Sequence, residues 1–132
     1  MTQPLEQKGR ILLVDHDEEW LSSAKSVLEK LSYEVDISMS ITEALELPDK
    51  YDLVLMNWVQ ADQESLLLRR LAHPEASNAP CVVVMFPIQQ LPQRMRAVFK
   101  AGAYDCVDKP FDQQELIKLV ETLQKECVLS KN

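Results

Sequence analysis

Polar side chains that could do chemistry follow three short apolar runs of the chain. Asp15, His16 and Asp17 come directly after the run ILLV, and Asn57 comes directly after LVLM. Lys109 follows a third run, YDCV, with one aspartate between them. The acid–histidine–acid sequence could bind a transition metal, and a carboxylate beside an ammonium group could form an ion pair. Either chemistry requires that these residues meet in the fold, which depends on the elements that position them.

Five short apolar runs predict the strands that position these residues, and they lie at 11–14, 34–38, 53–56, 81–86 and 104–107. The first, third and fourth runs are continuously apolar, which is typical of parallel strands that are buried on both faces. The carboxyl ends of parallel strands lie at one edge of a sheet. The polar residues that follow the strands are therefore expected to meet at that edge.

Helical patterns alternate with these strands. Asp17, Ser40 and Asp112 are each expected to cap a helix, because each precedes a stretch with helical character. Two further helices are expected at 64–72 and 91–99. The second is indicated by the apolar residues Leu91, Met95, Val98 and Phe99, and Gly102 is expected to end it. The order is a strand followed by a helix, five times. This order predicts an α/β fold with a doubly wound parallel sheet between two helix layers.

The length and composition indicate one globular domain. The chain has 132 residues, of which 46% are hydrophobic, and this is enough for a buried core. Residues 10–126 are expected to form the domain, with 1–9 as a flexible N-terminus and 127–132 as a C-terminal tail. Acidic residues outnumber basic residues by 21 to 14, which gives a net charge of −7. This charge argues against direct binding to nucleic acid.

The cysteines and the apolar runs bear on the compartment. The three cysteines form no CxxC pattern, and Cys81 and Cys106 lie in apolar surroundings. They are expected to act as small buried hydrophobes rather than as zinc ligands. The polar N-terminus lacks the apolar core of a signal peptide, and the longest apolar run is too short to span a bilayer. These features predict a protein of the reducing cytoplasm, with no membrane anchor and no metal site.

Four segments of the chain together resemble the receiver domain of two-component response regulators. They are ILLVDHDEEW, YDLVLMN, APCVVVMF and AGAYDCVDKPFD, and the resemblance extends over residues 10–125. It implies a flavodoxin-like (βα)5 fold with strand order 2-1-3-4-5. It also implies a site at the carboxyl ends of the strands. In the family, two acids and an acceptor aspartate bind Mg²⁺ there, and a lysine neutralises the phosphoryl group.

Two positions of this sequence match the family's site, and four depart from it. Asp15 matches the first acid and Lys109 matches the lysine, and the resemblance implies a cis bond between Lys109 and Pro110. The second acid, the acceptor aspartate, the hydroxyl residue of the fourth strand and the switch aromatic are replaced by His16, Asn57, Met85 and Cys106. An amide is a poor phosphoryl acceptor, and a methionine cannot donate a hydrogen bond. The sequence therefore predicts a degenerate phosphorylation site with no catalytic residue and with weak or absent Mg²⁺ binding.

The residues of this degenerate site have structural alternatives. We expect Asp15 and Lys109 to form a structural ion pair rather than a remnant of catalysis. Asn57 is expected to fill the site through hydrogen bonds to Asp15, Lys109 or nearby backbone groups, with ligand binding as the alternative. His16 is expected to be solvated or hydrogen-bonded, while a pH sensor or a transition-metal ligand stays open. Asp17 is expected to cap a helix, although a shift of one residue would let it replace the missing acid.

These expectations favour a pseudo-receiver, a phosphorylation-independent protein-interaction module in bacterial-type signal transduction, and not an enzyme. Its expected partner is a protein or a covalently linked output domain, and a homodimer through the same face is an alternative. The resemblance implies that this face consists of the fourth helix, fifth strand and fifth helix, with the candidates Arg94, Lys100, Tyr104, Asp108, Gln114 and Lys118.

Two rival functions are retained. An active response-regulator receiver would be phosphorylated on a non-standard residue, Asp15 or Asp17. A small-ligand sensor would bind a nucleotide or a flavin, as doubly wound folds often do. The sequence has only two glycines and no GxGxxG motif, so we rank the sensor last.

Overall fold

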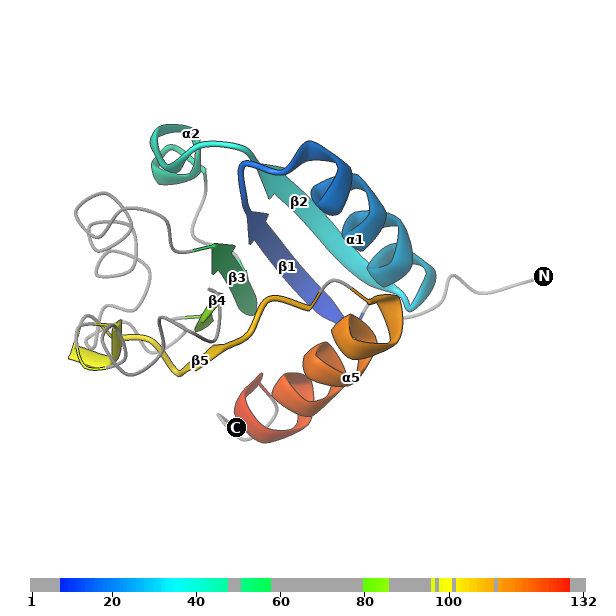
Figure 1. Cartoon of the computed structure of the whole chain (residues 1–132). Helices are drawn as coiled ribbons and strands as arrows, with labels where there is room; N and C mark the ends of the chain where they lie inside the picture. The colour runs from blue at the N-terminus through cyan, green and yellow to red at the C-terminus, as the bar shows by residue number, and fades with distance from the viewer. Residues whose placement is uncertain are drawn as a thin grey trace.

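The computed structural model describes residues 8–47, 51–57, 80–85, 96, 98–100, 102–110 and 112–128 of the chain. Its five strands are β1 (Gly9–Val14), β2 (Tyr33–Ser38), β3 (Leu53–Asn57), β4 (Cys81–Met85) and β5 (Asp105–Val107). All neighbouring strands are parallel, and their order in the sheet is β2-β1-β3-β4-β5 (Figure 1). The strand order implied by the family resemblance is therefore confirmed.

The described helices begin at the caps that the sequence predicts. They are α1 (Glu18–Lys30), α2 (Ile41–Leu45) and α5 (Gln113–Leu123), and α5 continues into the π-helical turn η2 (Gln124–Val128). The carboxylate of Asp17 accepts the backbone N–H of Trp20 at 3.1 Å, and the carboxylate of Asp112 accepts that of Gln114 at 2.7 Å. The hydroxyl of Ser40 accepts a backbone N–H in the same way at 3.1 Å. Each cap satisfies a backbone donor that the first turn of a helix leaves unpaired.

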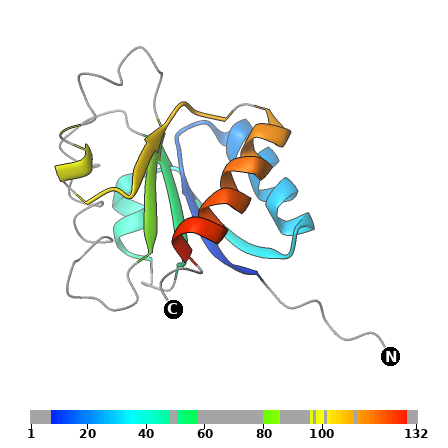
Figure 2. The same ribbon diagram turned by 90° about the horizontal axis from the view of Figure 1, so that it is seen from below.

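The sheet lies between two layers of helix, as predicted. Figure 2 shows α1 and α5 on one face of the sheet and α2 on the other. Alternate residues of each central strand point to opposite faces, and both sets are buried. The α1–α5 side of the core includes Leu13, Leu55 and Val83. The α2 side includes Leu12, Val54 and Val82. Burial on both faces explains why these strands are continuously apolar.

The segment before β5 ends a helix as the sequence predicts. Gly102 has a φ of 115°, and its N–H donates to the carbonyl of Phe99 at 3.0 Å. The next N–H, from Ala103, donates to the carbonyl of Val98 at 3.2 Å. This pair of bonds is a Schellman cap with Gly102 at C′. Of the two residues expected on the apolar stripe here, Val98 is buried, but Phe99 is 40% exposed. The predicted helix at 64–72 lies outside the described residues, as does most of 91–99.

A disulfide bond joins Cys81 at the start of β4 to Cys127 in η2, which corrects the prediction for these cysteines. Cys81 is buried as expected but is not a free thiol, and Cys127 is buried rather than part of a loose tail. The sequence conceals this pairing because the two residues are 46 positions apart. In a parallel α/β fold, a helix runs back along the sheet and ends near the start of the strands. The bond removes the basis for expecting a reducing compartment, which rested on unpaired cysteines.

The structured part of the chain is slightly longer than residues 10–126. β1 begins at Gly9, and η2 extends to Val128. Cys106 is buried and is a free cysteine, as predicted. Within the described ranges, every helix is too short or too polar to cross a lipid bilayer.

Candidate functional site at the carboxyl end of the sheet

Four strands deliver the predicted site residues to one edge of the sheet. Asp15 follows β1, Asn57 ends β3 and pairs in register with Met85 at the end of β4, and Lys109 follows β5. The strands are parallel, so these ends meet, and the carboxyl end of the sheet is formed as predicted (Figure 1).

A buried ion pair lies at the centre of this carboxyl end of the sheet. The site residues there, Asp15, His16, Asn57, Met85 and Lys109, are called the corner here. The ammonium Nζ of Lys109 lies 2.6 Å from Oδ2 of Asp15. The side chain of Asp15 is fully buried, and that of Lys109 is 9% exposed. Each charge would be costly in this environment without the other, so the pair is mutually dependent. The predicted ion pair is confirmed.

Trp20 completes the surroundings of Lys109, a role that the sequence did not predict for it. Nζ of Lys109 lies 4.9 Å from the centre of the Trp20 ring, which is a cation–π contact. The indole Nε1 donates a hydrogen bond to the carbonyl of Pro110 at 2.8 Å. Trp20 therefore holds both the lysine and the loop that follows β5. A tryptophan one turn into the helix that starts beside Asp15 is the signal that could have indicated this role.

The bond between Lys109 and Pro110 is not cis, which corrects the expectation taken from the family. The described residues contain no cis peptide bond, and both of these residues belong to them. The preference for trans over cis before a proline is only about 0.5–1 kcal/mol. A small difference of this kind is decided by the surrounding packing rather than by the dipeptide.

Asn57 and His16 lie at the outer edge of the ion pair. The amide nitrogen of Asn57 is 3.4 Å from Nδ1 of His16, and this same Nδ1 is 3.4 Å from Oδ1 of Asp15. The side chain of His16 is 69% exposed. The expected partners of Asn57 were Asp15, Lys109 or nearby backbone groups, and the observed contact is instead to His16. His16 is both solvated and hydrogen-bonded. Asp17 caps α1, and its own N–H donates to Oδ1 of Asp15 at 3.1 Å.

The positions that would detect a phosphoryl group are buried and apolar. Met85 is completely buried within the α1–α5 side of the core. Cys106 is buried on the α2 side. Burial, together with the charge of Asp105, raises the pKa of the Cys106 thiol, which keeps it protonated at neutral pH. Neither side chain presents a hydroxyl donor or a large ring to the corner.

The residues of the corner do not fit a Mg²⁺ site. Mg²⁺ prefers several oxygen ligands in octahedral geometry. One oxygen of Asp15 is paired with the Lys109 ammonium, and the other accepts the N–H of Asp17. The two positions beside it hold an imidazole and an amide, His16 and Asn57. Across the ranges that the structure describes, no cluster of three or more histidine, cysteine or acidic residues is arranged to hold a metal ion.

The structure describes most, but not all, of the residues of the predicted interaction face. Lys100, Tyr104, Asp108 and Gln114 are exposed around β5 and the start of α5, and Arg94 lies outside the described residues. Lys118 is exposed on α5, but it lines a pocket together with Lys8 and Tyr33. Tyr33 begins β2, the strand that is furthest from β5 in the sheet. Lys118 therefore belongs to a different neighbourhood from the residues around β5.

This fold and the placement of the site define a receiver-type α/β domain, and comparison with known proteins agrees. Residues 11–121 match the response regulator receiver domain family. The match covers most of the chain, so this protein belongs to the response regulator receiver domain family.

Two individual relatives align with most of this chain. The chain is 25% identical over 130 residues to the transcriptional regulatory protein RprY of Bacteroides fragilis, covering 97% of this chain and 54% of that protein. It is 30% identical over 111 residues to the two-component response regulator ARR11 of Arabidopsis thaliana, covering 81% of this chain and 21% of that protein. The chain thus spans about half or less of these relatives.

Solved structures support the fold. A response regulator from Thermotoga maritima has a TM-score of 0.72 with 24% identity, covering 92% of this chain and all of the other (100%). NtrX from Brucella abortus has a TM-score of 0.76 with 23% identity, covering 93% of this chain and 28% of the other.

Proposed function

We propose that this domain is a pseudo-receiver, a phosphorylation-independent interaction module of two-component signalling. The observation that supports this most strongly is that the charged residues of the corner are buried and already paired. There the Lys109 ammonium is 2.6 Å from Asp15 and lies over Trp20, while Asn57 stands at the acceptor position. A receiver needs this lysine for the phosphoryl oxygens, an acceptor carboxylate and a hydroxyl donor. Two of these three groups are replaced, and the lysine is already paired.

The geometry weighs against phosphorylation at a non-standard aspartate. Asp15 is fully buried, and its oxygens are bound by Lys109 and by a backbone N–H. Asp17 is committed to the cap of α1. Phosphorylation of either residue would break a contact that holds the corner or the helix. We therefore expect no phosphoryl transfer, no enzymatic activity of another kind, and weak or absent Mg²⁺ binding.

The domain is proposed to act through a protein partner or a covalently linked output domain at the face around β5. Two aromatic side chains, Phe99 and Tyr104, are 40% and 44% exposed there. Exposed aromatic side chains are common anchors of protein interfaces. Lys100 and Asp108 beside them supply polar rim contacts. We expect this interaction to involve neither nucleic acid nor a membrane.

Phosphodonor treatment tests the proposal directly. The chain is incubated with Mg²⁺ and a saturating small-molecule phosphodonor such as acetyl phosphate, and its intact mass is recorded. No mass gain is expected, and a receiver that retains all three groups serves as the positive control. Stoichiometric addition of one phosphate would contradict the proposal, and fragmentation would then identify the modified aspartate.

Restoring the acceptor alone is expected not to restore switching. Asn57→Asp supplies a carboxylate, but Met85 and Cys106 still lack the means to respond to a phosphoryl group. Beryllofluoride, which mimics the phosphoryl group, is added to this variant and amide chemical shifts are followed by NMR. Shifts confined to the carboxyl end are expected. Shifts that spread over β5 and α5 would show that the switch survives.

A further inference from the structure

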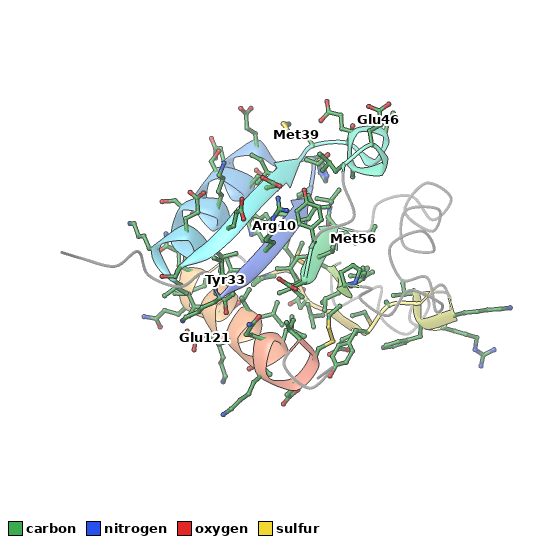
Figure 3. The ribbon with its side chains drawn as sticks, turned by 180° about the vertical axis from the view of Figure 1, so that it is seen from behind. Arg10, Tyr33, Met39, Glu46, Met56 and Glu121 are labelled. Atoms are coloured by element: carbon green, nitrogen blue, oxygen red, sulfur yellow. A yellow bond between two sulfur atoms is a disulfide. The ribbon has the colours of Figure 1, made fainter. Side chains whose placement is uncertain are left out.

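A pocket of about 650 Å³ lies at the amino end of the sheet, opposite the corner described above. It is formed where the start of β2 and the residue before β1 meet the end of α5 and η2. Its walls include Lys8, Tyr33, Lys118, Glu121, Gln124 and Lys125, which are called the lysine pocket here. Figure 3 shows Tyr33 and Glu121 at this end of the molecule and Met39 and Glu46 at the other. Its volume lies in the range of small-molecule sites.

The charge of the lysine pocket is opposite to that of the chain. Three of its residues carry ammonium groups, Lys8, Lys118 and Lys125, and one carries a carboxylate, Glu121. The whole chain has a net charge of −7. A cluster of positive charge on an acidic protein favours an anion at that place, because the nearby lysines raise its local concentration.

Tyr33 lines the pocket with only a small part of its surface. The residue is 4% exposed, and Nζ of Lys8 lies 5.7 Å from the centre of its ring. Burial, and then the charge of Glu121, raise the pKa of Tyr33, so its hydroxyl remains protonated and able to donate. The long hydrocarbon stems of the lysines, beside the Tyr33 hydroxyl, suit a ligand with a flat apolar body and an anionic group.

The walls of the pocket are tied together by contacts between distant parts of the chain. The amide Nε2 of Gln124 donates to the carbonyl of Lys8 at 2.7 Å. The turn that bears Gln124 and Lys125 is anchored by the disulfide between Cys127 and Cys81. A site whose walls are already held in place loses less freedom when a ligand binds.

We propose that the lysine pocket binds a small organic anion, a carboxylate or phosphate monoester carried on an aromatic ring. The lysine ammonium groups pair with the anionic group, and the ring packs against the hydrocarbon stems of the lysines. This site lies at the opposite end of the sheet from the degenerate phosphorylation site. It therefore requires neither phosphorylation nor the proposed partner at β5.

Amide chemical shifts of the isotopically labelled full chain test the proposal, with phenyl phosphate and benzoate as probes. Saturable shifts are expected at Tyr33, Gln124 and Lys125, with a Kd of about 1 mM or tighter for one of the two anions. Benzyl alcohol, which has the ring without the charge, is expected to bind at least about tenfold more weakly. Inorganic phosphate, which has the charge without the ring, is expected to do the same.

Matched variants separate a built site from general attraction. Lys118→Gln/Lys125→Gln removes two charges from the pocket and is expected to weaken binding at least about tenfold. Lys25→Gln/Lys30→Gln removes two charges from α1, outside the pocket, and is expected to change the Kd by less than about twofold. Circular dichroism checks that both variants are folded. Equal weakening by both variants, or no saturable shift up to about 20 mM of either anion, would overturn the proposal.

Discussion

The two ends of the sheet are held together in different ways. At the carboxyl end, one buried ion pair between Asp15 and Lys109 is covered by Trp20. At the amino end, a disulfide and a hydrogen bond from Gln124 to Lys8 join distant segments, while lysine side chains remain at the surface of a pocket. At the first end, the charged groups of Asp15 and Lys109 are paired with each other in the interior. Those of the second end are available to a ligand.

This difference bears on where function lies in a receiver whose chemistry has changed. The family places its reaction at the carboxyl end, where parallel strands deliver polar side chains. Here the carboxylate of Asp15 and the ammonium of Lys109 are buried and paired with each other, so neither is offered to a phosphoryl group. The surface around β5 and the lysine pocket are then the places where we propose that this domain binds a protein partner and a small ligand.

The largest loss of stability is expected from removing the ammonium group at the carboxyl end. Lys109→Met leaves the fully buried carboxylate of Asp15 without its partner. The free energy of unfolding should therefore fall by about 3–5 kcal/mol, as is typical when one member of a buried pair is removed. Urea denaturation, with midpoint and slope compared with the wild type, measures this loss.

A double variant is the control for this prediction. Asp15→Asn/Lys109→Met removes both charges and should recover much of the lost stability, because no charge is left unpaired. If the double variant loses as much as the single variant, the ion pair is not what holds the carboxyl end.

A somewhat smaller loss of stability is expected from removing the disulfide at the amino end. Cys127→Ala removes a cross-link between positions 46 residues apart. Loop-closure entropy predicts a loss of about 2–4 kcal/mol from the free energy of unfolding. Denaturation in urea with and without a reductant measures it. The wild type should lose stability on reduction while Cys127→Ala does not, and a wild type that is insensitive to the reductant would contradict the bond.

A third variant probes a polar network beside the amino end. The hydroxyl of Tyr51 donates to Asp36 at 2.7 Å, and its ring lies 5.4 Å from the guanidinium of Arg10. Tyr51→Phe should lower the free energy of unfolding by about 1–2 kcal/mol at neutral pH, because a hydrogen bond to a carboxylate is lost. Denaturation in urea at pH 7 measures this cost.

The same tyrosine predicts a pH dependence. Burial and the hydrogen bond to Asp36 raise the pKa of Tyr51 to about 12. The unfolded chain has a tyrosine pKa of about 10, so the native state holds the proton more tightly. The stability from this group is therefore complete below about pH 10 and is lost as the pH rises through about 12. Between these values the wild type should lose stability faster than Tyr51→Phe, and parallel pH profiles would refute this.

The smallest change in stability is expected from a substitution of Asn57. Its amide contact to His16 is 3.4 Å long, and the His16 side chain is 69% exposed. Asn57→Ala should therefore change the free energy of unfolding by about 0.5 kcal/mol or less. A loss above about 1.5 kcal/mol in the same urea assay would show that Asn57 is a structural member of the closed corner.

The parts of the fold that were predictable depend on local sequence. The caps at Asp17, Ser40 and Asp112 follow from contacts across two or three residues. The site residues were also predicted correctly to lie close together, because parallel strands must end at a common edge. The bond between Lys109 and Pro110 was predicted wrongly as cis, and Phe99 was expected on the apolar stripe of its helix but is exposed. Both depend on packing by distant parts of the chain.

By itself, the sequence determined the elements, their order and the groups that reach the carboxyl end. Hydrophobic period and capping are encoded within short windows, so they need no coordinates, whereas the strand order was implied by the resemblance to a known family. Only the tertiary structure decided which partner each group takes. The hydrogen bond from Trp20 to Pro110 spans 90 residues, and the disulfide spans 46. Such contacts, and the lysine pocket between segments far apart in the chain, exist only after the helices have packed against the sheet.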